Sequence, residues 1–178
     1  MDAFEDLVAR LVRREGYWTR QNYMVNISKA DKVAIGLPSM PRPEVDIVAY
    51  RPATNTVVWV ECKSYLDSHG VQMAAFDGSN SKFAKRFRIF TDQTFREIVT
   101  GRLVEQLIEE GCALSGASVE HWLVAGKIAH KSATPVADHL AANGWRLIDR
   151  EWIRASLQAV SKEGYEDDVV TMAAKLLS

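Results

Sequence analysis

Two short apolar segments, residues 45–50 and 57–63, constrain the fold of this 178-residue chain more than any other feature. Both are rich in β-branched and aromatic residues, and the Arg-Pro-Ala-Thr-Asn between them predicts a hairpin turn. The second segment is apolar on both faces until its end, which is typical of a central strand covered on both sides. The pair nevertheless carries Asp46, Glu61 and Lys63. Because a charged group is costly to bury, we expect these residues to form a site.

Strand geometry predicts that the three charges meet. Alternation places Glu61 and Lys63 on one face of their strand, roughly 7 Å apart by strand rise. On the preceding strand, Asp46 shares its face with Val48 and Tyr50. Antiparallel pairing brings the start of the first strand beside the end of the second. Asp46 is therefore expected next to Glu61 and Lys63.

The residue types at this position suit metal-assisted hydrolysis. The Asp46 and Glu61 carboxylates and the Cys62 backbone carbonyl are hard oxygen ligands of the kind that Mg²⁺ prefers, with Mn²⁺ as an alternative. A bound metal would polarise a scissile phosphate and lower the pKa of an attacking water. Lys63 would stabilise developing negative charge or position the nucleophile. Taken singly, Asp46 and Glu61 have a simpler interpretation as solvated strand ends, with Lys63 as an ion-pair partner.

The remainder of the chain alternates helical and strand patterns. We expect helices at residues 2–15, 68–77, 92–110, 135–143, 150–160 and 167–177. We expect strands at residues 17–27, 45–50, 56–63, 119–128 and 145–148, with an irregular stretch from about 28 to 44. Strands connected by helical crossovers indicate an α/β fold with a mixed sheet flanked by helices. The length fits one domain spanning residues 1–178.

Asp46, followed after 14 residues by Glu61-Cys62-Lys63, resembles the PD-(D/E)XK nuclease superfamily. The resemblance implies a restriction-endonuclease-like αβββαβ core over about residues 2–128, with 129–178 as a C-terminal extension. Within this superfamily the chain is similar to Holliday-junction resolvases and Mrr-type nucleases. One departure is Val45, which stands where the motif has proline. The implied activity is Mg²⁺-dependent cleavage of DNA, most simply as an endonuclease.

Many members of this superfamily also carry a glutamate on the first helix, and the resemblance implies that role for Glu5. Its helical position, in line with Val8 and Val12, lets it face the sheet. The alternative is that Glu5 only stabilises the helix N-terminus through the helix dipole.

A cluster of basic residues is the second functional signal. Between residues 82 and 102 six basic residues outnumber two acidic ones, and phenylalanines are interleaved with them. The candidates for phosphate contacts are Lys82, Lys85, Arg86 and Arg88. An ordinary solvated face explains them equally well. Gln72 is a further candidate, because some nucleases of this kind place a polar residue near the metal on the helix after the Glu-x-Lys strand.

Overall composition limits the classes of protein that this chain represents. With 22 basic and 23 acidic residues it is not a protein that coats nucleic acid non-specifically, so contact with a polyanion must be local. The two cysteines form no CxxC pair, and no signal-like or membrane-spanning segment is visible, which predicts a cytoplasmic protein without a membrane partner.

Three functional alternatives follow from the sequence. The first is a nuclease acting on DNA, with RNA as an open alternative and with a homodimer expected if both strands are cut. The second is a catalytically inactive nucleic-acid-binding or assembly protein on the same fold. The third is an unrelated α/β interaction module whose charges coincide.

Overall fold

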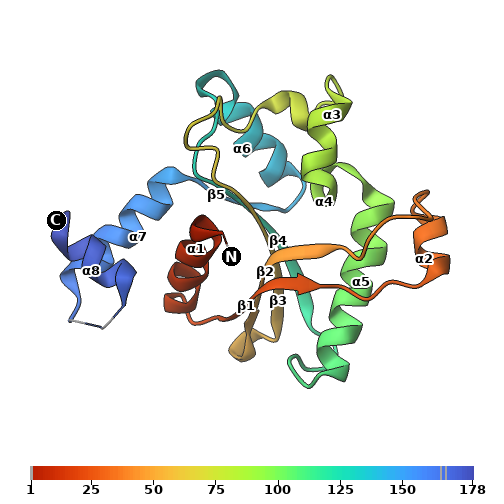
Figure 1. Ribbon diagram of the computed structural model, residues 1–178, viewed down its shortest axis with the longest axis horizontal. Helices are drawn as coiled ribbons and strands as arrows, with labels where there is room; N and C mark the ends of the chain where they lie inside the picture. Colours follow the sequence, from red (N-terminus) through yellow and green to blue (C-terminus); the bar gives the residue numbers. More distant parts are fainter. Residues whose placement is uncertain (1, 165, 167) are drawn as a thin grey trace.

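The computed structural model describes residues 2–164, 166 and 168–178 of the chain. Within these residues five strands form one mixed sheet in the order β1-β2-β3-β4-β5 (Figure 1). Their bounds are β1 Trp18–Met24, β2 Glu44–Arg51, β3 Thr56–Lys63, β4 Ser118–Ala125 and β5 Arg146–Ile148. The first three pair antiparallel, whereas β4 and β5 run parallel to β3. The expected α/β architecture with a mixed sheet is confirmed.

Helices cover both faces of this sheet (Figure 1). Within the described residues the α-helices are α1 Ala3–Arg14, α2 Lys29–Ala34, α3 Ser81–Ala84, α4 Arg88–Thr91, α5 Gln93–Glu109, α6 Ala133–Ala142, α7 Arg150–Lys162 and α8 Val169–Leu176. Short 3₁₀ segments are η1 Pro52–Thr54, η2 Met73–Ala75, η3 Lys85–Phe87 and η4 His130–Ser132. Buried side chains of α5 and α6 pack on one face, and those of α1, α7 and α8 pack on the other.

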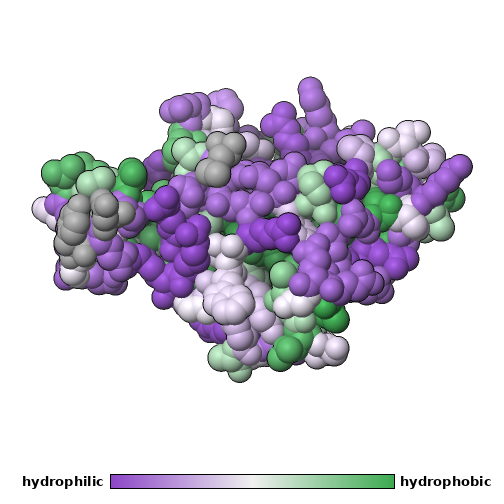
Figure 2. All heavy atoms as spheres, turned by 60° about the horizontal axis from the view of Figure 1, so that its bottom comes forward, coloured by the Kyte–Doolittle hydropathy of each residue, from purple (hydrophilic) through white to green (hydrophobic). Residues whose placement is uncertain are grey.

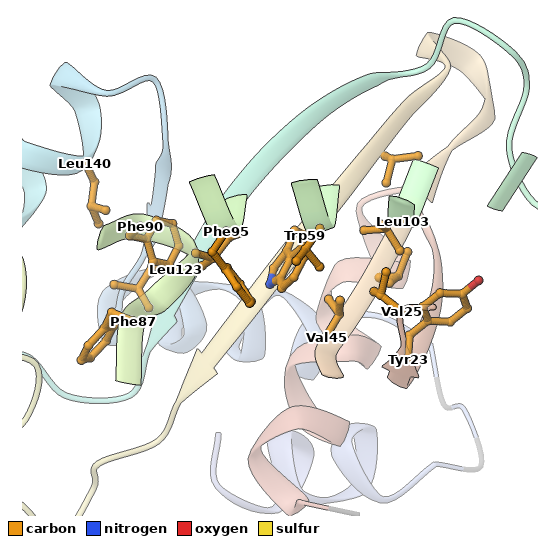
Figure 3. Packing of buried hydrophobic residues seen from close by; sticks show 14 of the residues in the cluster. Tyr23, Val25, Val45, Trp59, Phe87, Phe90, Phe95, Leu103, Leu123 and Leu140 are labelled. Atoms are coloured by element: carbon orange, nitrogen blue, oxygen red, sulfur yellow. The ribbon is translucent and has the colours of Figure 1, made fainter. Parts of the chain in front are cut away.

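The α5 face of the sheet is built around Trp59, which is fully buried on β3. Its ring contacts Phe95 of α5 edge-on, with the ring centroids 6.5 Å apart. Figure 3 shows that the cluster extends from Tyr23 at one end to Phe87 and Phe90 at the other. An aromatic layer therefore continues from the centre of the sheet to the segment that carries the basic residues.

The opposite face is covered first by α1. Asp2 caps this helix by accepting a hydrogen bond from the Phe4 amide at 2.7 Å, and basic residues lie in its last turn. Val8 and Val12 are fully buried against Val58 and Val60 of β3 and their neighbours. The amphipathic helix expected over residues 2–15 is confirmed, and it fixes the position of Glu5 relative to the sheet.

The prediction of a helix over residues 68–77 is wrong. This segment is a loop followed by the single 3₁₀ turn η2. Gly70 adopts a left-handed conformation with φ of +84°, and Val71 forms a parallel bridge with Ile128. A Cβ atom at Gly70 would lie 2.9 Å from the Lys127 carbonyl oxygen, so the segment is packed tightly against the chain that follows β4. Tertiary contacts override the local helical pattern here.

Two other segments contain helices that the sequence pattern did not predict. The stretch 28–44 is not wholly irregular, because Ser28 and Asp31 form a reciprocal capping box that starts α2. Residues 81–91 form α3, η3 and α4, three short turns in succession. The strand expected over 17–27 is also shorter, ending at Met24.

The strand expected over residues 119–128 ends earlier, at Ala125. The first residue of the helix expected over 167–177 lies outside the described residues, and α8 begins at Val169. The other elements beyond residue 128 begin and end within about two residues of expectation. There β5 extends the sheet, α6 covers the α5 face, and α7 and α8 cover the α1 face. In the part of the chain that the structure describes, every helix is too short or too polar to cross a lipid bilayer.

Candidate active site

The site lies where the β2–β3 hairpin opens, at the ends distal to its turn. The antiparallel register runs from Arg51 opposite Thr56 to Ile47 opposite Val60. Beyond that point the Cys62 amide donates a hydrogen bond to Oδ2 of Asp46 at 2.7 Å. A side-chain carboxylate has therefore taken the place that a main-chain acceptor holds in the regular ladder.

The alternation of β2 is interrupted at Asp46. Val45 packs on the α5 face with Val48, whereas Ile47 and Ala49 pack on the α1 face. Strict alternation would have placed Val45 with Ile47. Asp46 lies at this interruption, between Val45 on the α5 face and Ile47 on the α1 face. The predicted neighbours of Asp46 are correct, and the interruption itself is a feature that the sequence pattern did not predict.

Asn22 on β1 lies opposite this interruption. It has a left-handed backbone with φ of 50°, and the β1–β2 register passes from Gln21–Ile47 to Tyr23–Val45. Its amide donates to Glu44 at 3.0 Å and more weakly to Glu5 at 3.4 Å. Sequence reasoning missed both Asn22 and Glu44. The one available signal was that Asn tolerates left-handed backbone, which does not by itself indicate a site.

Lys63 joins the two carboxylates. Its Nζ lies 2.6 Å from Oε1 of Glu61 and 3.9 Å from Oδ2 of Asp46, and it donates to the Cys62 carbonyl oxygen at 3.1 Å. The side chains are 16–22% exposed, so the cluster is largely withdrawn from water yet still accessible. The structure brings together Asp46, Glu61, Lys63 and the Cys62 carbonyl as predicted. The lysine ammonium neutralises the oxygens that a metal ion would use.

Burial and neighbouring charges together raise the pKa values of both Asp46 and Lys63. Burial, reinforced by the negative charge of Glu61, raises the pKa of Asp46 to about 7, although Lys63 and the Cys62 amide oppose the shift. For Lys63, burial lowers the pKa, but the charges of Glu61 and Asp46 outweigh it and the net pKa is raised. Near neutral pH Asp46 is therefore divided between its protonated and ionised forms, and Lys63 is charged.

Glu5 faces this cluster from α1. It is half-buried, and burial together with the negative charge of Asp2 raises the pKa of its carboxyl. The positive charge of Lys63 acts on Glu5, and the charge of Glu5 in turn raises the pKa of Asp46. Glu5 is thus electrostatically part of the site, and Asn22 connects it by hydrogen bonds to β2.

Three of the four basic candidates lie beside Glu61. Lys85, Arg86 and Arg88 line a cleft of about 350 Å³ whose lining also includes Glu61 and Trp59. We call this hollow the basic cleft. Lys82 lies outside its lining, exposed on α3.

The basic residues of the segment differ in what they already bind. Arg88 forms an ion pair with Asp92 at 2.9 Å and stacks over Phe95. Arg102, counted in the same basic segment, pairs with Asp31. Within the described residues Lys85 and Arg86 form no ion pair, so they are the cations best able to meet a ligand.

Gln72 lies on the loop after β3 and not on a helix. It lines a second hollow, of about 200 Å³, together with Tyr65 and Phe87. The structure places it near the site but in a different hollow from the basic cleft.

The donor set fits a hard divalent cation that keeps part of its water shell. Within residues 2–164, 166 and 168–178, no three His, Cys, Asp or Glu side chains gather as a metal-binding group. Two carboxylates and a main-chain carbonyl do meet, and Mg²⁺ is commonly held by one or two carboxylates with several waters. Trp59 supports this set, with its Nε1 3.5 Å from Oε2 of Glu61.

Comparisons of the chain with protein-family models, with curated proteins and with solved structures gave no match. The function must therefore be argued from the site itself.

Proposed function

We propose that this chain is a metal-dependent nuclease that hydrolyses phosphodiester bonds in DNA. The observation that carries the proposal is the convergence of Asp46, Glu61, Lys63 and the Cys62 carbonyl at the opened end of the β2–β3 hairpin. Charged groups withdrawn from water with a strongly shifted pKa are characteristic of functional sites.

In this proposal Asp46, Glu61 and the Cys62 carbonyl hold Mg²⁺ or Mn²⁺. When bound, the metal supplies Lewis-acid polarisation of the phosphate and an activated water. Lys63 stabilises negative charge that develops on the phosphate, because its ammonium lies among the same oxygens. Glu5 orients water from the α1 side of the site. Trp59 limits the positions available to the Glu61 carboxylate.

The basic cleft supports nucleic acid as the substrate. Lys85 and Arg86 are exposed cations that line the same hollow as Glu61. A phosphate backbone held by them would pass the carboxylate that binds the metal. The near-zero net charge of the chain makes this local concentration of positive charge the natural docking surface.

The order of elements supports a restriction-endonuclease-like core as the finer description of the fold. A helix, an antiparallel three-stranded meander, a crossover helix and a parallel strand follow in the order α1, β1–β3, α5 and β4. The candidate residues lie on the second and third strands of this order. The proposal takes this core to span about residues 2–128.

A catalytically inactive binding protein on the same fold is the second candidate. The observation that favours it is the ion pairing of Lys63 with Glu61 at 2.6 Å and, more distantly, with Asp46 at 3.9 Å. A permanent ion cluster of this kind would anchor the ends of β2 and β3 and leave only the basic cleft for a nucleic acid.

The test is to incubate the chain with supercoiled, linear, branched and single-stranded DNA, in Mg²⁺, in Mn²⁺ and in chelator. The nuclease proposal expects metal-dependent nicking that Glu61→Gln abolishes. Binding of the same substrates without cleavage in either metal would instead support the inactive binding protein. Because the described part of the chain carries this site once, simultaneous cleavage of both strands would require two copies.

A further inference from the structure

A second hollow, of about 200 Å³, opens directly beside the candidate active site. We propose that it binds one unpaired nucleobase of the substrate strand, next to the phosphate that is cut. We call it the base hollow. This inference rests on the proposed nuclease function and adds a substrate class to it, namely DNA with an unpaired nucleotide near the cleavage position.

The base hollow adjoins the catalytic lysine. Phe87 forms part of its wall, and Nζ of Lys63 lies 6.0 Å from the centroid of that ring. Tyr65, two residues after Lys63, forms another wall and contacts Phe87 edge-on, with centroids 6.5 Å apart. A group in this hollow would therefore lie close to the lysine that meets the phosphate.

Arg86 connects the base hollow to the basic cleft, because its side chain lines both. A strand whose phosphates follow Lys85 and Arg86 past Glu61 would bring the next base to the mouth of the hollow. The two neighbouring hollows thus separate the two parts of a nucleotide, with cations on one side for the phosphate and aromatic rings on the other for the base.

Size and chemistry favour a nucleobase as the occupant. An apolar cavity of about 150 Å³ is large enough to bind benzene, so about 200 Å³ has room for a single heteroaromatic ring. Apolar and aromatic side chains form most of the wall, among them Val71, Ala75 and Phe83. His69 and Gln72 provide polar groups at the rim, which suit the hydrogen-bonding edge of a base.

The walls are held in a fixed geometry before any ligand arrives. The Val71 amide donates to the Lys127 carbonyl at 3.0 Å, and the Ala129 amide donates to the Val71 carbonyl at 2.9 Å. Tyr65 has a left-handed backbone with φ of 44°, an uncommon conformation for a bulky residue. Strain retained next to a site is typical of a segment whose shape is needed for function.

The inference requires the base to leave a duplex stack. A base in an intact helix cannot enter the base hollow unless it is unpaired and turned out, which costs a few kcal/mol and is easiest in single strands. Single-stranded, flapped or mismatched DNA should therefore bind more tightly than an intact duplex of the same length.

The experiment measures binding in chelator, where no cleavage takes place. A labelled single-stranded 12-mer is titrated with wild type, Phe83→Ala, Ala75→Leu and the control Phe76→Ala by fluorescence anisotropy. Phe83 and Ala75 line the hollow, whereas Phe76 packs against Phe87 from outside its lining. We expect Phe83→Ala and the filled Ala75→Leu to weaken binding about 5- to 100-fold, as loss of one stacked base does. Phe76→Ala, which removes a ring that supports Phe87 without lining the hollow, should weaken binding less than either.

A second arm replaces successive nucleotides of the 12-mer by abasic sites. One position should account for most of the loss in wild type, and that position should no longer matter in Ala75→Leu. Equal binding by all four proteins, or indifference to every abasic site, overturns the inference. Because metal-dependent nicking is scored separately, cleavage with base-indifferent binding removes only the base hollow, and base-dependent binding without cleavage removes only the nuclease proposal.

Discussion

Asp46 connects stability to function at the scale of single residues. Burial and the Glu61 charge raise the pKa of its carboxyl from 3.8 to about 7 in the folded chain. The folded state therefore favours the protonated form, so this contribution to stability is complete below about pH 4 and is lost as the pH rises through 7. In chelator the free energy of unfolding should therefore fall as the pH rises from about 4 through 7.

Replacement of Asp46 by Asn isolates that decline. The amide oxygen can still accept the hydrogen bond from Cys62, but the side chain no longer ionises. We expect the drop in the free energy of unfolding between pH 5 and pH 8 to shrink by on the order of 2 kcal/mol relative to wild type. Urea unfolding in chelator at several pH values measures it. Asp138→Asn, an exposed position on α6, is the control, and a drop identical in all three proteins would contradict the account.

A divalent cation should offset the loss of stability that accompanies ionisation of Asp46. In the proposed function Mg²⁺ is held by the ionised carboxylates of the folded chain, so it should raise the melting temperature more at pH 8 than at pH 6, where protons compete for Asp46. At a hundredfold excess over its dissociation constant the gain is about 2.7 kcal/mol. Thermal unfolding with and without Mg²⁺ measures the shift, and Asp46→Asn should reduce it strongly. A shift of the same size in that variant would place the metal elsewhere.

Much of the site is predictable from its residues because strand periodicity is a local rule. Alternation alone places Glu61 and Lys63 together, and hairpin pairing adds Asp46. Asn22 and Glu44 were not predictable, because their roles depend on the left-handed turn of β1 opposite the interruption in β2. The interruption places Val45 on the α5 face, whereas the strict alternation that a sequence pattern assumes would place it with Ile47 on the other face.

At the scale of elements, the loop after β3 is locked to the end of β4. A Cβ atom at Gly126 would lie 2.4 Å from the Ser64 carbonyl oxygen, a main-chain atom that cannot move without shifting the loop. The Gly126 amide also donates to the Lys63 carbonyl at 2.9 Å. A change at Gly126 should therefore reach both the candidate site and the base hollow.

Gly126→Ala should lower the free energy of unfolding by about 1–3 kcal/mol, as overpacking commonly does. The matched control is Gly101→Ala in the middle of α5, where a Cβ atom meets nothing within 4 Å. That change should stabilise the chain by about 0.5–1 kcal/mol, because alanine is the better helix former. Chemical denaturation measures both. The two substitutions should change the free energy of unfolding in opposite directions. An unchanged free energy in Gly126→Ala would show that the loop after β3 is not locked to the end of β4.

Helix α5 and the segment 68–77 illustrate where a sequence pattern predicts secondary structure correctly and where it does not. Helix α5 was predicted almost to the residue because Phe95, Val99, Leu103 and Leu107 recur at helical spacing and are all buried. The segment 68–77 has no such repeated apolar spacing, and its conformation is set by the bridge between Val71 and Ile128. Contacts distant in sequence decide the conformation wherever a segment has no strong period of its own.

At the scale of the whole molecule, the net charge is close to zero, and positive charge is concentrated at the basic cleft. Figure 2 shows one face of the molecule that is polar over much of its area, with apolar side chains at several places, among them the end that carries the C-terminal helix α8. There Val169, Leu176 and Leu177 are exposed. Nucleic-acid binding is expected at the basic cleft on another part of the surface.

The double variant Lys85→Ala/Arg86→Ala should weaken DNA binding and make it less sensitive to salt. Each lost phosphate contact lowers the slope of log affinity against log salt concentration by about 0.7–0.9. Titrations in chelator at several salt concentrations measure this slope. Arg150→Ala/Lys162→Ala removes the same charge from exposed positions on α7 and should leave the slope unchanged. Equal losses in the two double variants would mean that binding is diffuse.

One measurement tests the central claim most directly: the rate at which supercoiled plasmid is nicked in Mg²⁺ by wild type, Lys63→Ala and Lys131→Ala. Lys63 lies among the oxygens of the site, whereas Lys131 is exposed on η4. Circular dichroism should first show that all three proteins fold. We predict metal-dependent nicking by wild type and Lys131→Ala, and a rate about 10²–10³-fold lower for Lys63→Ala. Nicking by Lys63→Ala at the wild-type rate, or no nicking by folded wild type in Mg²⁺ or Mn²⁺, would contradict the account.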